Sequence, residues 1–154
     1  MKRITALTLL LLWTSVISAA QSAEKPSEPS LRGTSFLQGI KSAIEAHLGR
    51  PYVWGSSGMK SFDCSGFIWR LMYENGVLLK RTTARKFYMM LPPVSKDEQW
   101  SFGTLVFFDN LKHVGIIDTP DAFYHAQVSI GTNRSPMNSF WKRKIYGFRQ
   151  LPRP

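Results

Sequence analysis

The order of two hydrophobic patterns along the chain limits its fold more than any other sequence feature. Up to about residue 90, apolar residues recur at helical spacing, which predicts helices over 34–48, 63–75 and 83–90. From residue 104 onward, short runs rich in branched and aromatic residues alternate with turns, which predicts strands over 104–108, 113–118, 122–128 and 144–149. Helices followed by strands with short turns predict an α+β domain with an antiparallel sheet rather than an alternating doubly wound fold.

The first 20 residues have the pattern of a secretory signal peptide. Lys2 and Arg3 precede an apolar run that ends near Ile17, and small residues follow up to Ala20, where we expect cleavage. About 14 apolar residues are too few to span a bilayer comfortably. No cysteine follows the run, so we expect no lipid attachment and no membrane span after cleavage, and a periplasmic or secreted protein. Residues 21–32, rich in proline, serine and charge, are expected to form a flexible leader before one domain at 33–154.

The chain is strongly basic. Its 20 Lys and Arg residues exceed its 10 Asp and Glu residues, for a net charge of +10, and loss of Lys2 and Arg3 leaves 18 against 10, or +8. A surplus of this size attracts anionic partners such as nucleic acid, anionic lipid or anionic cell-wall polymer. Export makes nucleic acid the poorest of these partners, and a solvated basic surface is the simpler alternative.

Cys64 is the only cysteine of the chain and stands at the start of a predicted helix. Asp63 fits the N-cap position, so that Cys64 would lie in the first helical turn, where the helix dipole lowers the pKa of a thiol. A nearby imidazolium would lower that pKa further. Gly66 leaves room for a substrate or a neighbouring strand. The alternative is a small buried core residue without chemistry.

His113 is the candidate base, and it lies 113 − 64 = 49 residues after Cys64 at the start of a predicted strand. His125 follows 12 residues later, and two strands joined by a turn would bring the two rings together, with His125 orienting His113. Either histidine can also be a satisfied residue of a half-buried strand. We interpret His47, late in the first helix, as structural or exposed. A zinc site with Cys64 is a further rival, but the short ligand spacings of such sites are missing.

Several segments together resemble the NlpC family of bacterial cell-wall cysteine peptidases. They are Leu48-Gly49-Arg50-Pro51-Tyr52-Val53-Trp54-Gly55, Phe62-Asp63-Cys64-Ser65-Gly66-Phe67-Ile68, Gly103-Thr104-Leu105-Val106-Phe107-Phe108, His113-Val114-Gly115-Ile116-Ile117 and Phe123-Tyr124-His125-Ala126. The resemblance runs from about residue 33 to 151. It implies a papain-like α+β fold and cleavage of peptidoglycan stem peptides, commonly between D-glutamate and diaminopimelate.

The resemblance also implies roles for single residues. Cys64 matches the nucleophile, His113 the general base and His125 the residue that orients the base. Tyr52 matches a tyrosine of the oxyanion site. Asp63 and Ser65 match positions that in some relatives bind the free amine of the first alanine, which would limit the enzyme to stems lacking the glycan. Departures from the family pattern, such as Gly55-Ser56 in place of Gly-Gly, leave the three catalytic positions untouched.

These observations favour a monomeric, secreted cysteine endopeptidase that uses no cofactor and no metal and acts on peptidoglycan stem peptides. Anionic wall polymer is a further expected partner, and nucleic acid is not. Two alternatives stay open: a non-catalytic wall-binding or partner-binding module with the same fold, and another amide hydrolysis or acyl transfer by the same residues.

Overall fold

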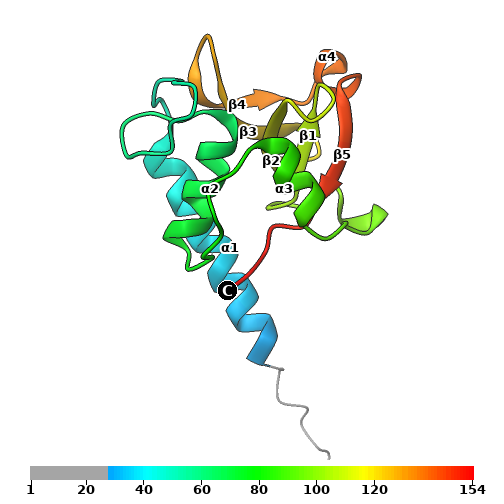
Figure 1. Cartoon of the computed structure of the whole chain (residues 1–154). Helices are drawn as coiled ribbons and strands as arrows, with labels where there is room; N and C mark the ends of the chain where they lie inside the picture. Colours follow the sequence, from blue (N-terminus) through cyan, green and yellow to red (C-terminus); the bar gives the residue numbers. More distant parts are fainter. Residues whose placement is uncertain (1–27) are drawn as a thin grey trace, which may run out of the picture.

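The computed structural model describes residues 28–154, and within them the order of elements matches the prediction of helices first and strands last (Figure 1). The predicted signal peptide 1–20 and residues 21–27 of the predicted leader lie outside the described residues. The helices are α1 (Glu28–His47), α2 (Cys64–Glu74), α3 (Ala84–Met90) and α4 (Ser139–Lys142), with a 3-10 turn η1 (Lys96–Glu98). The strands are β1 (Leu105–Phe108), β2 (His113–Thr119), β3 (Ala122–Gln127), β4 (Gly131–Pro136) and β5 (Ile145–Arg149).

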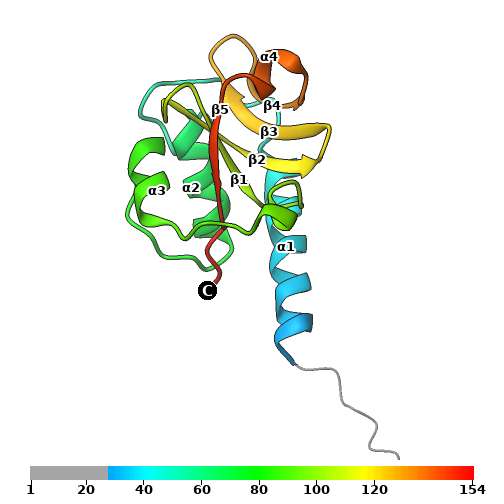
Figure 2. The ribbon, with the colours of Figure 1, turned by 90° about the vertical axis from the view of Figure 1, so that its right-hand side faces the viewer.

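Helix α1 begins earlier than its sequence pattern predicts. We expected a cap at Thr34 or Ser35, whereas the helix starts at Glu28, inside the segment expected to be a flexible leader. Pro29 falls in the first turn, where a missing backbone N–H costs no helical hydrogen bond. Figures 1 and 2 both show the first turns of α1 extending beyond the rest of the domain. The apolar face begins only at Phe36 and therefore marks where the helix packs, not where it starts.

The sheet is antiparallel throughout, with strand order β4-β3-β2-β1-β5. The prediction missed β4 because its sequence, Gly-Thr-Asn-Arg-Ser-Pro, contains residues that are poor strand formers. Strand β3 offers a free row of backbone groups, and β4 pairs with it along its whole length, from Gln127 with Gly131 to Ala122 with Pro136. The four-residue helix α4 and the turn η1 were also missed.

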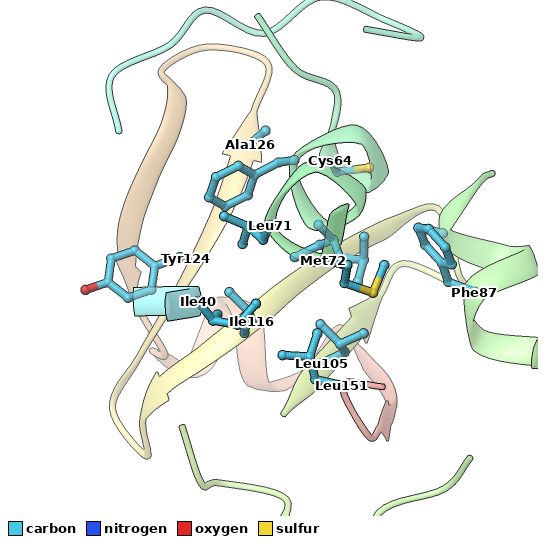
Figure 3. Packing of buried hydrophobic residues seen from close by; sticks show 14 of the residues in the cluster. Ile40, Cys64, Leu71, Met72, Phe87, Leu105, Ile116, Tyr124, Ala126 and Leu151 are labelled. Atoms are coloured by element: carbon cyan, nitrogen blue, oxygen red, sulfur yellow. The ribbon is translucent and has the colours of Figure 1, made fainter. Parts of the chain in front are cut away.

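The main core lies between the sheet and the helices. Ile40 of α1, Leu71 and Met72 of α2, and Phe87 of α3 pack against Leu105, Ile116 and Tyr124 of the sheet (Figure 3). Cys64 lies at the edge of this cluster, at the start of α2 (Figure 3).

A second cluster covers the opposite face of the sheet. Val106 and Phe108 belong to it, whereas the alternating Leu105 and Phe107 belong to the main core, as expected for a strand buried on both faces. Trp141, in α4, packs against this second cluster. Within residues 28–154, no helix has the length and apolar character that crossing a membrane requires.

Candidate functional site

The start of α2 holds Cys64 in the position that the sequence predicts. Asp63 is the N-cap, and its Oδ1 accepts a 2.6 Å hydrogen bond from the backbone N–H of Gly66. Gly66 is required here, because a Cβ at this position would lie 2.0 Å from the carbonyl oxygen of Ser56. That carbonyl accepts a 2.9 Å bond from the backbone N–H of Asp63. The close neighbour of Gly66 is thus the loop before α2, and this contact fixes the loop against the cysteine.

The carboxylate of Asp63 is buried in a charged network. Nη2 of Arg81 lies 2.6 Å from its Oδ1 and 2.7 Å from its Oδ2. The backbone N–H of Gly55 donates to Oδ2 at 2.9 Å, and the Ser65 hydroxyl donates to Oδ1 at 3.1 Å. Ser65 in turn accepts a 3.1 Å bond from Nη1 of Arg81. Sequence reasoning did not identify Arg81 as a site residue, because the 18 positions that separate it from Asp63 carry no local signal.

The thiol of Cys64 lies against the backbone next to His113. The side chain is almost fully buried, and Sγ is 3.9 Å from the carbonyl oxygen of Lys112. Neither imidazole is a hydrogen-bond partner of the thiol in this structure. Burial, and after it the negative charge of Asp63, raises the pKa of the Cys64 thiol. The expected lowering of that pKa is therefore absent, because the cost of burying a thiolate exceeds the help from the helix start and from Arg81.

A cavity of about 630 Å³ opens beside Cys64. Its walls come from four segments: Trp54 and Gly55 before α2, Asp63 to Ser65 at the start of α2, residues 81–85 around the start of α3, and Leu111 with Lys112 before β2. The thiol is thus shielded from bulk water yet borders a space that a ligand can enter.

The two histidines of the sheet are hydrogen-bonded to each other. Nε2 of His113, at the start of β2, lies 2.7 Å from Nδ1 of His125 in β3. Nε2 of His125 lies 2.9 Å from the hydroxyl of Ser135 in β4. That hydroxyl donates a 2.9 Å bond to Oδ1 of Asn133, whose Nδ2 donates a 2.8 Å bond to the carbonyl of Gly131. The missed strand β4 therefore supplies two further members of the site.

This chain of hydrogen bonds has a fixed direction. The carbonyl of Gly131 can only accept, so the amide of Asn133 presents its oxygen to Ser135. Because the Ser135 proton is used there, Ser135 accepts from Nε2–H of His125. Nδ1 of His125 then carries a lone pair and accepts from Nε2–H of His113. Neutral His113 is left with an unprotonated Nδ1, the state that a general base requires.

Burial keeps both rings neutral. It lowers the pKa of His113 to about 4. Burial and the neighbouring His113 lower the pKa of His125 to about 3. Trp141 covers the pair, with its ring stacked on His113 at 5.7 Å between centroids and edge-on to His125 at 5.1 Å. Trp141 is a fourth residue that sequence reasoning missed, since an aromatic residue in a surface segment gives no signal for this contact.

Tyr52, His113 and Trp141 line a second cavity of about 910 Å³, and Lys112 borders both cavities. Burial, with the charges of Cys64 and Asp63, raises the pKa of Tyr52 to about 12. At neutral pH Tyr52 is therefore a phenol that can donate a hydrogen bond near the site.

His47 lies apart from the site, as expected. It is buried, and its Nε2 lies 3.0 Å from both carboxylate oxygens of Glu74 at the end of α2. Within residues 28–154, no group of three or more His, Cys, Asp or Glu residues has an arrangement that would hold a metal ion.

A helix that begins with a cysteine and packs on an antiparallel sheet with two linked histidines defines a papain-like α+β domain, as the resemblance implies. The sequence pattern of the NlpC/P60 family matches residues 49–150, and the chain belongs to that family. It is 30% identical over 151 residues to the probable endopeptidase NlpC of Escherichia coli (strain K12), an alignment that covers 92% of this chain and 97% of that protein.

Other relatives are longer proteins. The chain is 32% identical over 117 residues to the probable peptidoglycan endopeptidase LytE of Bacillus subtilis (strain 168), covering 73% of this chain and 34% of LytE. A crystal structure of a protein similar to lipoprotein, of the NLP/P60 family, from Staphylococcus aureus has a TM-score of 0.66 at 29% identity, covering 78% of this chain and 42% of that one. The peptidoglycan hydrolase RipB of Mycobacterium tuberculosis, at 20% identity, has a TM-score of 0.66 and shares the fold, covering 82% and 69%.

Proposed function

We propose that the chain is a cysteine endopeptidase that hydrolyses peptidoglycan stem peptides, with Cys64 as nucleophile, His113 as base and His125 as the residue that orients the base. The directed hydrogen-bond chain from Gly131 through Asn133, Ser135 and His125 to His113 is the main support. It presents a basic nitrogen on His113, the residue directly after Lys112, whose carbonyl oxygen lies 3.9 Å from the thiol. The names of the E. coli and B. subtilis relatives support the reaction class.

In the proposed reaction, Nδ1 of His113 takes the thiol proton as Sγ of Cys64 attacks the amide carbonyl. The S–C bond forms, the amide C–N bond breaks, and His113 returns the proton to the leaving amine. Water then hydrolyses the thioester with the same base. The pKa directions imply that the resting pair is a neutral thiol and a neutral imidazole, so proton transfer accompanies attack. Substrate must also bring the His113 ring within reach of the thiol, since apo geometry is often longer than the reactive one.

We further propose the bond between D-glutamate and diaminopimelate as the one cut, a monomeric enzyme, and export by the predicted signal peptide 1–20 to the periplasm or the medium. The resemblance supports the bond, and the name of the B. subtilis relative, a probable peptidoglycan endopeptidase, supports the location. Lys112, Arg143 and Lys144 around the second cavity offer a basic surface for anionic wall polymer. Sedimentation of the protein with purified sacculi should then weaken as salt rises.

Digestion of defined muropeptides followed by mass spectrometry tests the proposal. The wild-type protein should release a product that ends in D-glutamate, and the Cys64→Ala variant should release none. Persistent cleavage by Cys64→Ala would refute the assignment of the nucleophile.

A non-catalytic binding module is the second candidate, and one observation favours it. The raised pKa of Cys64, together with the lack of a thiol–imidazole hydrogen bond, is also what an inert buried cysteine would show. Alkylation of Cys64 separates the two functions when it is followed with and without a bound stem peptide. Slow alkylation and no turnover under every condition would favour the module.

A further inference from the structure

We propose that the cavity beside Cys64 accepts stem peptides whose first amino group is acylated, as it is in stems linked to the glycan, and rejects stems with a free ammonium. This inference rests on the proposed function. It differs from the expectation that Asp63 and Ser65 bind a free amine, because both residues are already engaged in hydrogen bonds within this chain.

The acceptor capacity of Asp63 is already filled. A carboxylate has about four lone-pair sites. Here they receive the backbone N–H groups of Gly55 and Gly66, the hydroxyl of Ser65, and the guanidinium of Arg81, which contacts both oxygens. The Ser65 oxygen also accepts from Arg81. An ammonium could reach Asp63 only by displacing Arg81 from a largely buried ion pair.

The charge of the cavity wall also disfavours an ammonium. Arg81 neutralises Asp63, and the remaining charged residues of the lining, Arg85 and Lys112, are both basic. Arg85 contacts the backbone carbonyl of Asn110 rather than an acidic group. A ligand on this side of the thiol therefore faces a net positive wall, which favours a carboxylate and a neutral acyl amide over a free ammonium.

The mouth of the cavity suits a group larger than an amine. Trp54 belongs to the lining and is 85% exposed, so its ring stands free at the edge of the cavity. An exposed indole provides a flat apolar surface with a polar edge, against which an acyl group or a sugar ring can pack. The volume of about 630 Å³ leaves room for such a group next to the thiol.

Binding to the full-length Cys64→Ala variant tests this inference without turnover. Calorimetry would compare one stem tripeptide in three forms: with a free amino terminus, N-acetylated, and linked to muramic acid. We expect both acylated forms to bind at least about tenfold more tightly than the free form, which corresponds to 1.4 kcal/mol. Equal or tighter binding of the free form, or no binding of any form at millimolar concentration, would overturn the inference.

Two variants in the same background locate the cause. Arg81→Ala frees Asp63 and should reduce the preference for the acylated forms, whereas Arg85→Ala removes the same charge without touching Asp63 and should keep it. If Arg81→Ala fails to fold, the three-ligand comparison still decides. If the muramic acid form binds more tightly than the N-acetylated form, and Trp54→Ala abolishes this difference, the sugar is also recognised. If the two acylated forms bind with equal affinity, only the acyl group is recognised.

Wild-type digestion of the same ligands keeps the two proposals apart. A preference for acylated ligands without any cleavage would contradict the proposed reaction and leave the inference standing. Cleavage with a preference for the free amine would support the proposed reaction and contradict the inference.

Discussion

The two sides of the candidate site are stabilised by different means. On the helix side, Asp63 and Arg81 form a charged network that ties the start of α2 to the loop before it. On the sheet side, His113, His125, Ser135 and Asn133 form a chain without formal charge. On the charged side, the acceptor sites of Asp63 are all occupied. On the uncharged side, every hydrogen bond is donated in the same direction along the chain, from His113 towards His125 at one end and from Asn133 to Gly131 at the other, and Nδ1 of His113 keeps a lone pair.

The two sides can therefore contribute different things to a reaction. A saturated ion pair resists rearrangement and therefore suits positioning of the thiol and of the cavity wall. A neutral histidine pair can accept a proton at one end and pass hydrogen-bond polarisation to the other, which suits proton transfer. The thiol lies 3.9 Å from the carbonyl oxygen of Lys112, the residue directly before His113 of the uncharged side.

The largest effect should come from removing the thiol that joins the two sides. Cys64→Ser should lower turnover of muropeptides by at least about 10⁴-fold, and His113→Ala should cost about as much, because members of a catalytic unit are non-additive. Product release measured by mass spectrometry, with circular dichroism to verify folding, checks this. His47→Gln is the matched control, since it alters a buried histidine outside the site. Loss of turnover in the control as large as in His113→Ala would contradict the assignment.

Acid should destabilise the uncharged side. The folded-state pKa values of His113 and His125 are lowered to about 4 and about 3, below the unfolded value of 6.5. The unfolded chain therefore binds more protons below pH 6.5, and stability is lost as pH falls from 6.5 toward those values. Each ring should remove up to about 1.4 kcal/mol per pH unit in this range.

Urea unfolding at pH 7 and at pH 4.5 measures this loss. The His125→Gln variant should show a smaller difference between the two pH values than the wild type. An equal loss of unfolding free energy between pH 7 and pH 4.5 in both proteins would mean that the buried histidine rings do not cause the acid destabilisation.

Breaking the charged side should cost stability. Asp63→Asn keeps an oxygen at the N-cap but leaves Arg81 without its counter-ion, and we expect a loss of about 2–3 kcal/mol in unfolding free energy. Asp109→Asn is the matched control, because it breaks the more exposed pair with Lys144 and should cost less than about 1 kcal/mol. Similar losses in the two variants, measured by urea unfolding, would show that the Asp63–Arg81 pair has no special weight.

The smallest expected effect concerns the far end of the uncharged chain. Asn133→Asp places a negative charge near Ser135 and His125, which favours protonated imidazole. The acid limb of kcat/KM should therefore move to higher pH by about one unit, a shift of roughly 1.4 kcal/mol. If the pH profile of Asn133→Asp were identical to that of the wild type, Asn133 would have no influence on the histidines.

Ser135→Ala should lower kcat by roughly tenfold with little change in KM, because His125 loses the acceptor that sets its tautomer. Steady-state kinetics at pH 7 measures this, and an unchanged kcat would show that Ser135 does not orient His125.

Much of the fold was predictable because its signals are local. The cap at Asp63, the two candidate caps Thr82 and Thr83, and the apolar periodicity of α2 predicted two helices almost to the residue; the structure has its cap at Thr83. Strand β4 was not predictable, because Gly131 to Pro136 form a strand only where β3 offers an edge. The early start of α1 was missed for a related reason, since its first turns lack an apolar face.

For the site, the residues that are chemically able to act could be found in the sequence: a lone cysteine behind a helix cap and two histidines on neighbouring strands. Their electrostatic state and their hydrogen-bond partners arise only in the folded protein. Burial raises the pKa of Cys64, whereas its position at the helix start predicts a lowering. Arg81 occupies acceptor sites of the Asp63 carboxylate, and Ser135 and Asn133 set the tautomers of the two histidines. Desolvation and hydrogen-bond direction depend on all the groups around an atom, and most of these groups come from distant parts of the chain.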